Sequence, residues 1–246
     1  MLGTVDTRNE IAAETSAQAA VQTPIICDGL DLGETKRLVS LSRKRELRVK
    51  TTLFFEMDPA RYVYEVQEGI LKLYRLTSDG RRQITGFVYP GQFLGLTQAG
   101  CHVATAEAIT PVVVWCYLRE RLEGLIDEMP SLARRLLSLA NDELLSAQNQ
   151  ILWLGRKNTM ERVGAFLLQL AERVRGGGGD PSELHLPMSR TDIADYLGLT
   201  VETVSRTFTR LRKMGAIRLG ESGRHVRCDL DWLRRLTDAE DGPTVH

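Results

Sequence analysis

The sequence predicts an α+β protein that joins an antiparallel β-domain, one long helix and a helical C-terminal domain. Two patterns along the chain support this order. Short runs rich in Val, Ile, Tyr and Phe occupy residues 45–118, whereas apolar residues recur at helical spacing from Arg119 onward. A chain of 246 residues is long enough for two domains, each with its own core.

Composition excludes several classes of protein. With 43% hydrophobic and 26% charged residues, the chain has the profile of a folded protein rather than a disordered or fibrous one. It has no run of 18 apolar residues and no secretory signal, so we expect a cytoplasmic protein that does not contact a membrane. Four widely spaced cysteines predict free thiols and no bound metal: Cys27, Cys101, Cys116 and Cys228.

The N-terminal half is predicted to begin with an arm and continue as a β-barrel. Residues 1–24 are polar without a clear period, which is typical of a mobile arm. In residues 25–118, turn signals about ten residues apart indicate antiparallel hairpins. The alternating residues 62–67 should form a half-buried strand, and the run 112–117, apolar on both faces, should form a central strand.

Residues 119–154 are predicted to form one long dimerisation helix. Its apolar seam repeats at alternating spacings of four and three, with small and large side chains in turn: Ala133, Leu137, Ala140, Leu144, Ala147, Ile151 and Leu154. This heptad pattern favours a two-stranded coiled coil with a second copy of the chain. Neighbouring leucines leave open the alternative that the helix packs on its own β-domain, and both arrangements can coexist.

Residues 189–214 have the pattern of a helix-turn-helix. A Ser-x-x-Asp capping box at 189–192 begins the first helix, Gly198 ends it, and Thr200 caps the second helix. Ala194 supplies the small residue that a close helix crossing needs, and Val204 supplies the apolar plug.

The C-terminal domain is predicted to span residues 155–236, before an acidic tail at 237–246. A hairpin turning at 220–223 follows the two helices and makes the domain a winged helix-turn-helix. Residues 155–236 contain 15 Lys+Arg and 10 Asp+Glu, a net charge of +5, whereas residues 1–154 contain 17 and 19, a net charge of −2. A basic cluster of this kind can neutralise phosphates, although it could also be a solvated face.

The second helix of the motif is predicted to read base edges in double-stranded DNA. Arg can hold guanine in a bidentate pair, Glu can accept from cytosine, and Ser can bond either edge, so we assign Glu202, Ser205 and Arg206 to base readout. We assign a second group to the DNA backbone: Thr200, Thr209, Arg210, Lys213, Arg218 and Arg224. The alternative is a solvated face on which Glu202 and Arg206 form an i,i+4 ion pair.

These features together resemble the cyclic-AMP receptor protein and FNR superfamily of bacterial transcription regulators. The resemblance covers nearly the whole chain, and the Glu-x-x-Ser-Arg within Tyr-Leu-Gly-Leu-Thr-Val-Glu-Thr-Val-Ser-Arg at 196–206 is similar to the FNR and FixK branch. It implies a jelly roll like that of cyclic-nucleotide-binding domains. It also implies a homodimeric activator, not an enzyme, on a palindromic site of the TTGAT-N4-ATCAA type.

The resemblance also bears on cofactors. Members that bind cyclic AMP have a Gly-Glu-Leu segment and an Arg-Ser/Thr pair, but residues 95–97 here read Gly-Leu-Thr and residues 102–103 read His-Val. Members with an iron–sulfur cluster have several N-terminal cysteines, but here only Cys27 and Cys116 correspond. We therefore expect no cofactor, as in FixK. The alternative is a regulator gated by haem with nitric oxide or by a degenerate iron–sulfur site.

Cys228 is a candidate redox site. Arg227 precedes it, and a neighbouring guanidinium would lower the pKa of the thiol and make it oxidisable close to DNA. The alternative is an inert, buried strand residue.

The charged turn at residues 78–82 should be the exposed tip of a hairpin. Activators of the superfamily present such tips to RNA polymerase, so the resemblance implies a polymerase contact through Asp79, Arg81 and Arg82. A solvated turn is the alternative.

Overall fold

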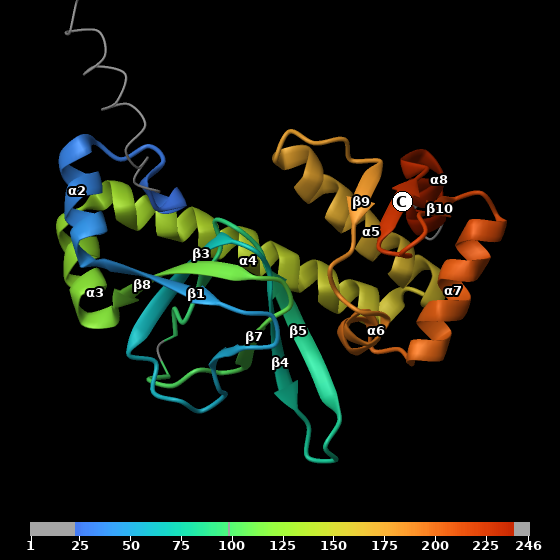
Figure 1. Cartoon of the computed structure of the whole chain (residues 1–246), viewed down its shortest axis with the longest axis horizontal. Coiled ribbons are helices and arrows are strands. Elements are labelled where there is room, and N and C mark those ends of the chain that lie inside the picture. Colours follow the sequence, from blue (N-terminus) through green and yellow to red (C-terminus); the bar gives the residue numbers. More distant parts are fainter. Residues whose placement is uncertain (1–22, 98, 239–246) are drawn as a thin grey trace, which may run out of the picture.

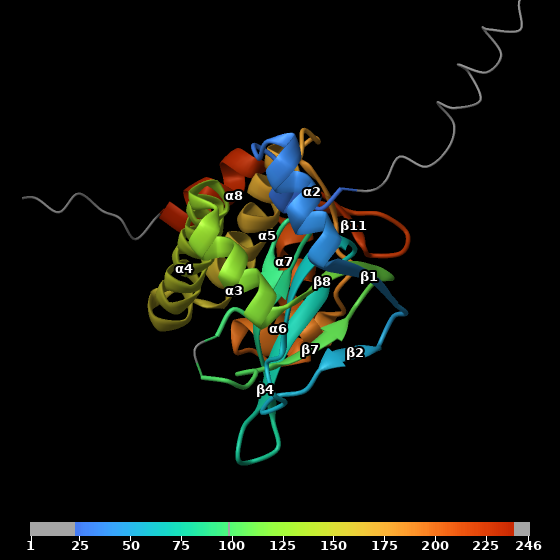
Figure 2. The ribbon, with the colours of Figure 1, turned by 90° about the vertical axis from the view of Figure 1, so that its left-hand side faces the viewer.

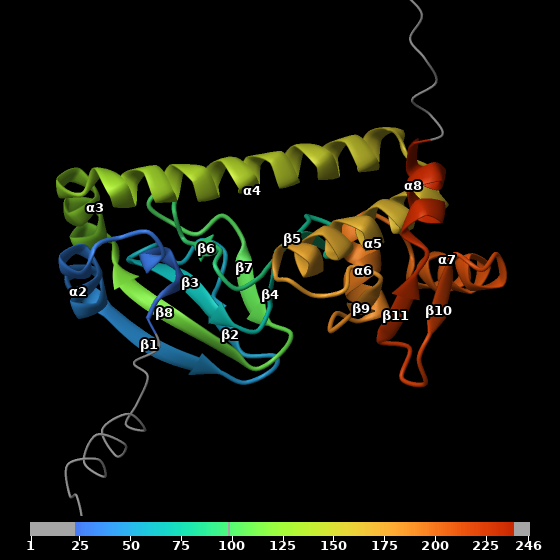
Figure 3. The same ribbon diagram turned by 90° about the horizontal axis from the view of Figure 1, so that it is seen from above.

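The computed structural model describes residues 23–97 and 99–238 and contains two domains joined by a long helix. Helix α4 (Pro130–Arg156) runs along both domains, which lie on the same side of it (Figures 1 and 3). No helix in the described ranges is long and apolar enough to cross a membrane.

The β-domain is a jelly roll of two four-stranded antiparallel sheets. Buried Val66, Leu71 and Val114 lie in its core. The first sheet has the order β1 (Ser42–Leu47), β8 (Val112–Leu118), β3 (Tyr62–Glu68) and β6 (Phe93–Leu94). The second has the order β2 (Thr52–Phe54), β7 (Thr105–Ala108), β4 (Leu71–Leu76) and β5 (Arg82–Val88). The run 112–117 is central, as predicted, and the predicted barrel takes the form of a jelly roll whose two sheets are not closed into one barrel.

Strand β3 differs from its prediction at Glu65. Alternation places this residue on a polar face, yet its side chain is fully buried. The carboxylate accepts hydrogen bonds from the Ile26 N–H (2.7 Å) and from the Tyr117 hydroxyl (3.0 Å). Glu65 is paired in this way because a single-turn helix, η1 (Ile25–Cys27), covers it.

The predicted helix over residues 119–154 is in fact two helices. Helix α3 (Arg119–Glu128) ends before Pro130, which begins α4, because proline lacks an N–H and fits only the first turn of a helix. Helix α4 also continues two residues past the predicted end. Its early residues Leu132 and Leu136 are buried against α3 and an additional helix, α2 (Leu32–Leu41).

The C-terminal domain is the predicted winged helix-turn-helix, with a three-stranded antiparallel sheet in the order β10-β11-β9. Strand β9 and helix α8 were not predicted. Of the predicted terminal arm and acidic tail, residues 1–22 and 239–246 lie outside the described residues, and residues 237–238 belong to α8. The elements are α5 (Thr159–Gly176), β9 (Glu183–His185), α6 (Arg190–Leu197), α7 (Val201–Lys213), β10 (Ile217–Leu219), β11 (His225–Cys228) and α8 (Leu230–Asp238).

In addition to the core of the jelly roll, one hydrophobic cluster spans both domains. Ile84 and Phe87 on β5 are buried together with the apolar residues of the C-terminal domain. The Phe87 ring centroid lies 5.1 Å from that of Tyr196 and 6.3 Å from that of Phe166. Strand β5 therefore packs on the helix-turn-helix, whereas the turn of the β4–β5 hairpin projects away from both domains (Figure 2).

Candidate nucleic-acid interface

The helix-turn-helix is built from the predicted local signals. The Ser189 hydroxyl accepts from the Asp192 N–H, and the Asp192 carboxylate accepts from the Ser189 N–H, both at 3.0 Å. Gly198 has φ +63°, a left-handed conformation that favours glycine, and the Thr200 hydroxyl accepts from the Thr203 N–H. The predicted start of both helices and the predicted end of the first are confirmed.

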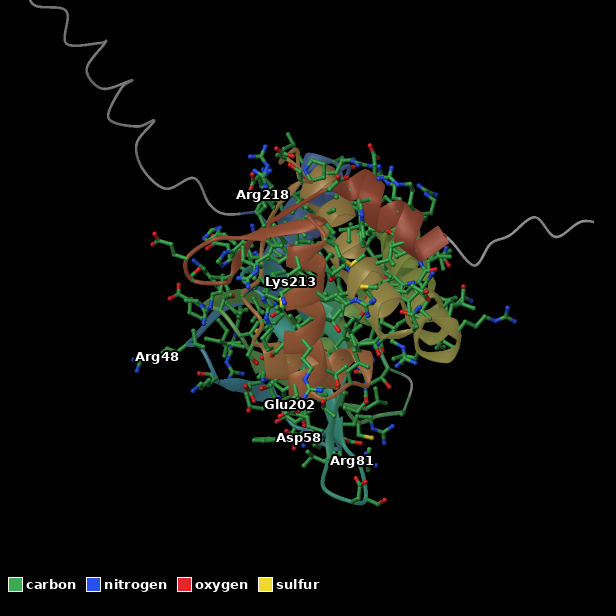
Figure 4. The ribbon with its side chains drawn as sticks, turned by 90° about the vertical axis from the view of Figure 1, so that its right-hand side faces the viewer. Arg48, Asp58, Arg81, Glu202, Lys213 and Arg218 are labelled. Atoms are coloured by element: carbon green, nitrogen blue, oxygen red, sulfur yellow. The ribbon has the colours of Figure 1, made fainter. Side chains whose placement is uncertain are left out.

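Helix α7 buries one face and exposes the other. Val204, Phe208 and Leu211 are 0–2% exposed, so they fix the helix in the domain core. The predicted readout residues Glu202, Ser205 and Arg206 lie on the exposed face, together with Thr209 and Arg210. Figure 4 looks onto this face, with Glu202 near the start of the helix and Lys213 near its end.

The electrostatics of Glu202 suit a hydrogen-bond acceptor. Hydrogen bonds from its own N–H and from Thr200 lower the pKa of its carboxyl, and the charge of Arg206 lowers it further. Glu202 is therefore ionised at neutral pH and can accept from a base amino group.

The remaining predicted backbone contacts extend from α7 onto the wing. Thr200 and Lys213 are exposed at the two ends of α7, and Arg218 and Arg224 are exposed on the wing hairpin. Figure 4 shows Arg218 displaced to the side of α7, toward the wing. The structure thus leaves the predicted DNA-contacting residues exposed on α7 and on the wing.

Two arginines that sequence reasoning missed brace this face. The Arg190 guanidinium stacks 3.4 Å from the Phe208 ring centroid and donates to the Gly223 carbonyl, so it joins α6, α7 and the wing. Arg162 donates to the carbonyls of Leu154, Lys157 and Leu197, and so joins the end of α4 to the end of α6. Their long-range partners leave no local signal in the sequence.

Known proteins share both domains. Residues 161–236 match the Crp-like helix-turn-helix domain, and residues 44–129 match the cyclic nucleotide-binding domain. The nitrogen fixation regulation protein FixK of Bradyrhizobium diazoefficiens is 43% identical over 207 residues, which are 84% of this chain and 87% of that protein. The chain is a FixK-like member of the Crp/FNR family.

Other relatives agree with this assignment. The transcriptional activatory protein AadR of Rhodopseudomonas palustris is 40% identical over 79% of this chain and 81% of its own. The structure of FixK2 from Bradyrhizobium japonicum matches with a TM-score of 0.73 and 38% identity, over 79% of this chain and 96% of that one. These relatives are regulators rather than enzymes, so the prediction of a non-enzymatic DNA-binding protein is confirmed.

In this FixK-like chain, the jelly-roll segments that the resemblance assigns to cyclic-nucleotide binding contain neither the glutamate nor the arginine of the members that bind cyclic AMP. The positions that correspond to the nucleotide-binding segments, Gly95 to Thr97 and His102 with Val103, line an open cavity of about 1340 Å³ between the β-domain, α4 and α5. His102 stands where an arginine would meet the phosphate, and its ring stacks on Phe54 with 3.6 Å between centroids. These two segments therefore offer neither an arginine nor a glutamate to a cyclic nucleotide.

The two cysteines considered for an iron–sulfur cluster do not form a common site. Cys27 is buried with η1, α2 and α3, whereas Cys116 packs against the interior of the jelly roll. Burial raises the pKa of each thiol to about 11, which disfavours the thiolate that a cluster requires. Within residues 23–97 and 99–238, no three His, Cys, Asp or Glu side chains are grouped to hold a metal ion.

Two site predictions need correction. Cys228 is buried, and burial raises the pKa of its thiol to about 12, so the predicted lowering by Arg227 is wrong. Arg227 instead points outward and pairs with Glu183 at 3.3 Å. Arg82 is not free at a hairpin tip, because its guanidinium is bound by two carboxylates of helix α6.

Asp79 and Arg81 remain at the tip of the β4–β5 hairpin. The Arg81 guanidinium donates to the Asp79 carboxylate at 2.6 Å, and both side chains are exposed. The tip therefore presents one internally paired arginine rather than a run of free charges.

Proposed function

We propose that this FixK-like protein is a cytoplasmic, homodimeric transcription activator that reads a palindromic TTGAT-N4-ATCAA-type site. The observation that carries the proposal is the exposed face of α7, where Glu202, Ser205 and Arg206 stand on a helix fixed by caps and core residues. Arginine recognises guanine and glutamate recognises cytosine, so one face of this helix can read several adjacent base pairs.

The exposed surface of α4 supports the proposed homodimer. Leu137, Leu144 and Ile151 of the predicted seam are 63%, 55% and 69% exposed, which leaves a row of large apolar side chains facing solvent along the helix. Such a stripe is typical of an interface. A two-fold pair of α4 helices would present two α7 helices to two half-sites.

Binding without an effector is the third part of the proposal. It is supported by the missing nucleotide-binding charges at Gly95 to Thr97 and by the separate, protonated thiols of Cys27 and Cys116. RNA polymerase is the expected partner of the DNA-bound dimer, through the hairpin tip at Asp79 and Arg81.

The full chain should be titrated, with and without oxygen and with no added ligand, onto a TTGAT-N4-ATCAA duplex and a scrambled duplex at one fixed salt concentration. We expect selective binding in both atmospheres. Equal affinity for the two duplexes would contradict the readout assignment, and selectivity confined to one atmosphere would contradict effector-independent binding.

A second candidate keeps the DNA site and adds a gating ligand. The observation that favours it is the open cavity of about 1340 Å³, which Arg135, Trp153 and Arg173 also line. An absorption spectrum of freshly purified protein distinguishes haem or an iron–sulfur cluster, which absorb visible light, from the effector-free form, which does not.

A further inference from the structure

A cluster of five charged residues from both domains holds helix α6 against the β-domain. We call it the interdomain charge cluster. It combines three residues of the jelly roll with two carboxylates of α6: Lys72, Arg82, Glu107, Asp192 and Asp195.

Lys72 lies at the centre of this cluster. Its ammonium is 2.9 Å from the Glu107 carboxylate on β7 and 3.1 Å from Asp192 Oδ1 on α6. The side chain is 6% exposed, so both ion pairs are shielded from water. A buried lysine is stable only with such partners, and its removal would leave Glu107 without its cation and Asp192 with Arg82 alone.

Arg82 provides a second connection between the domains, to two carboxylates that lie one helical turn apart on α6. Its guanidinium bonds Asp192 Oδ1 at 3.1 Å and Asp195 Oδ2 at 2.7 Å, and these two carboxylates are three residues apart on α6. The adjacent Gln83 side chain donates to the Asp195 carbonyl at 2.7 Å. Bonds to both carboxylates fix the rotation of α6 about its own axis as well as its position.

Asp192 stays ionised despite its burial. Burial alone would raise the pKa of this carboxyl, but hydrogen bonds from Ser189 and from Lys72 together hold its pKa below the ordinary value. The carboxylate can therefore serve as the helix cap and as the partner of both cations at neutral pH.

Any contact that orients helix α6 also orients helix α7. Ile193 and Ala194 on α6 and Val204 on α7 are at most 1% exposed in the shared core, and the tight turn at Gly198 joins the helices directly. The two helices are thus packed as one unit against the β-domain.

We propose that Lys72 and Arg82 are positioning residues for DNA recognition, which set the angle of α7 relative to α4 through Asp192 and Asp195. This inference rests on the DNA-binding function proposed above. In a two-fold dimer, that angle determines the separation of the two recognition helices, and hence which spacer between half-sites both helices can reach. Readout of one half-site depends on the α7 side chains and not on the cluster.

The test compares spacer preference in the full-length protein. Affinities of the wild type and of a Lys72→Met, Arg82→Gln double variant are measured on duplexes with spacers of N4, N5 and N6 and on a single half-site. The control is Arg75→Gln on the same strand, because Arg75 pairs with Glu56 at 2.8 Å inside the β-domain and does not reach α6.

In the double variant, we expect the preference in affinity for the N4 duplex over the N5 and N6 duplexes to fall about tenfold, while the affinity for a single half-site stays unchanged. Arg75→Gln should retain the preference. Equal loss on every duplex, or an unchanged spacer preference, would overturn the positioning role. If the wild type itself does not select the TTGAT-type half-site, the proposed function fails instead.

Folding of the variants is checked by thermal unfolding. Should the double variant lose its cooperative transition, Asp195→Asn provides the same test at a more exposed position. It removes the negative charge that pairs with Arg82 and leaves Lys72 paired. A variant with Lys72→Arg in place of Lys72→Met keeps the positive charge. If this variant regains the N4 preference, the charge itself carries the positioning role.

Discussion

Lys72 and Asp192, 120 residues apart in sequence, are joined by a 3.1 Å hydrogen bond between the jelly roll and the first helix of the helix-turn-helix. The same Asp192 side chain accepts the Ser189 N–H through its other oxygen and so caps that helix. One carboxylate therefore contributes both to the local start of α6 and to its attachment to the β-domain.

Arg206→Ala should reduce discrimination at the guanine of the half-site by about 1–3 kcal/mol, because a bidentate base contact is lost. Competitive titration with single-base variants of the duplex measures this. Lys213→Ala is the matched control, since loss of a phosphate contact should weaken binding to all sequences alike. An unchanged preference for guanine in Arg206→Ala would refute the assignment.

Leu144→Glu should dissociate the dimer. Its side chain lies in the middle of the apolar stripe on α4, so the new charge would be buried between two helices at a cost of several kcal/mol. Sedimentation velocity reports the mass. Asn149→Glu adds the same charge to the same helix outside the seam and should leave the dimer intact; dissociation of both variants, or of neither, would argue against the seam.

The free energy of unfolding should fall as pH rises, because of the buried carboxyl of Glu65. Burial raises the pKa of this carboxyl to about 7, against hydrogen bonds from Ile26 and Tyr117 and the positive charge of Arg135. The folded state therefore holds a proton that the unfolded state releases above its ordinary pKa, so this contribution to stability is complete at low pH and is lost as pH rises through about 7.

Glu65→Gln should flatten that pH dependence of the free energy of unfolding, measured by denaturant titration between pH 5 and about 8.5. The amide retains an acceptor for the Ile26 N–H but does not titrate. A slope equal to that of the wild type would assign the pH dependence to other groups.

Arg81→Ala should abolish activation without affecting operator affinity, because Arg81 is exposed at the hairpin tip, which lies apart from α7 (Figure 1). Reconstituted transcription and duplex titration of the same preparation measure the two properties. Wild-type levels of transcript would remove this hairpin as a polymerase contact.

Cys228→Ala should respond to peroxide as the wild type does. The buried thiol with a raised pKa has too little thiolate to react, so any loss of DNA binding must come from other residues. Protection of DNA binding in the variant alone would show that Cys228 is oxidised.

Local sequence signals predicted the helix-turn-helix well, whereas contacts between residues far apart in sequence could not be predicted. Capping residues, the turn glycine and the amphipathic face of α7 act within a few residues, so Ser189, Gly198 and Thr200 could be placed from sequence. Strand β9 spans only Glu183–His185, which is too short for its alternation to be recognised.

The two wrong site predictions have definite physical causes. Arg227 and Cys228 are adjacent in sequence, but neighbouring side chains of a strand point to opposite faces, so the guanidinium and the thiol occupy different environments. Arg82 was placed in a turn by its glycine and aspartate neighbours, yet its partners Asp192 and Asp195 lie more than a hundred positions downstream.

The contact of Phe87 with Tyr196 and Phe166 has a consequence for exchanging domains between relatives. Because this aromatic group belongs to both halves of the chain, excising the C-terminal half would uncover its apolar side and remove the counter-charges of α6. A functional chimaera must therefore inherit β5 and α6 from the same parent, even though the predicted boundary between the domains, at residue 155, lies near the end of α4.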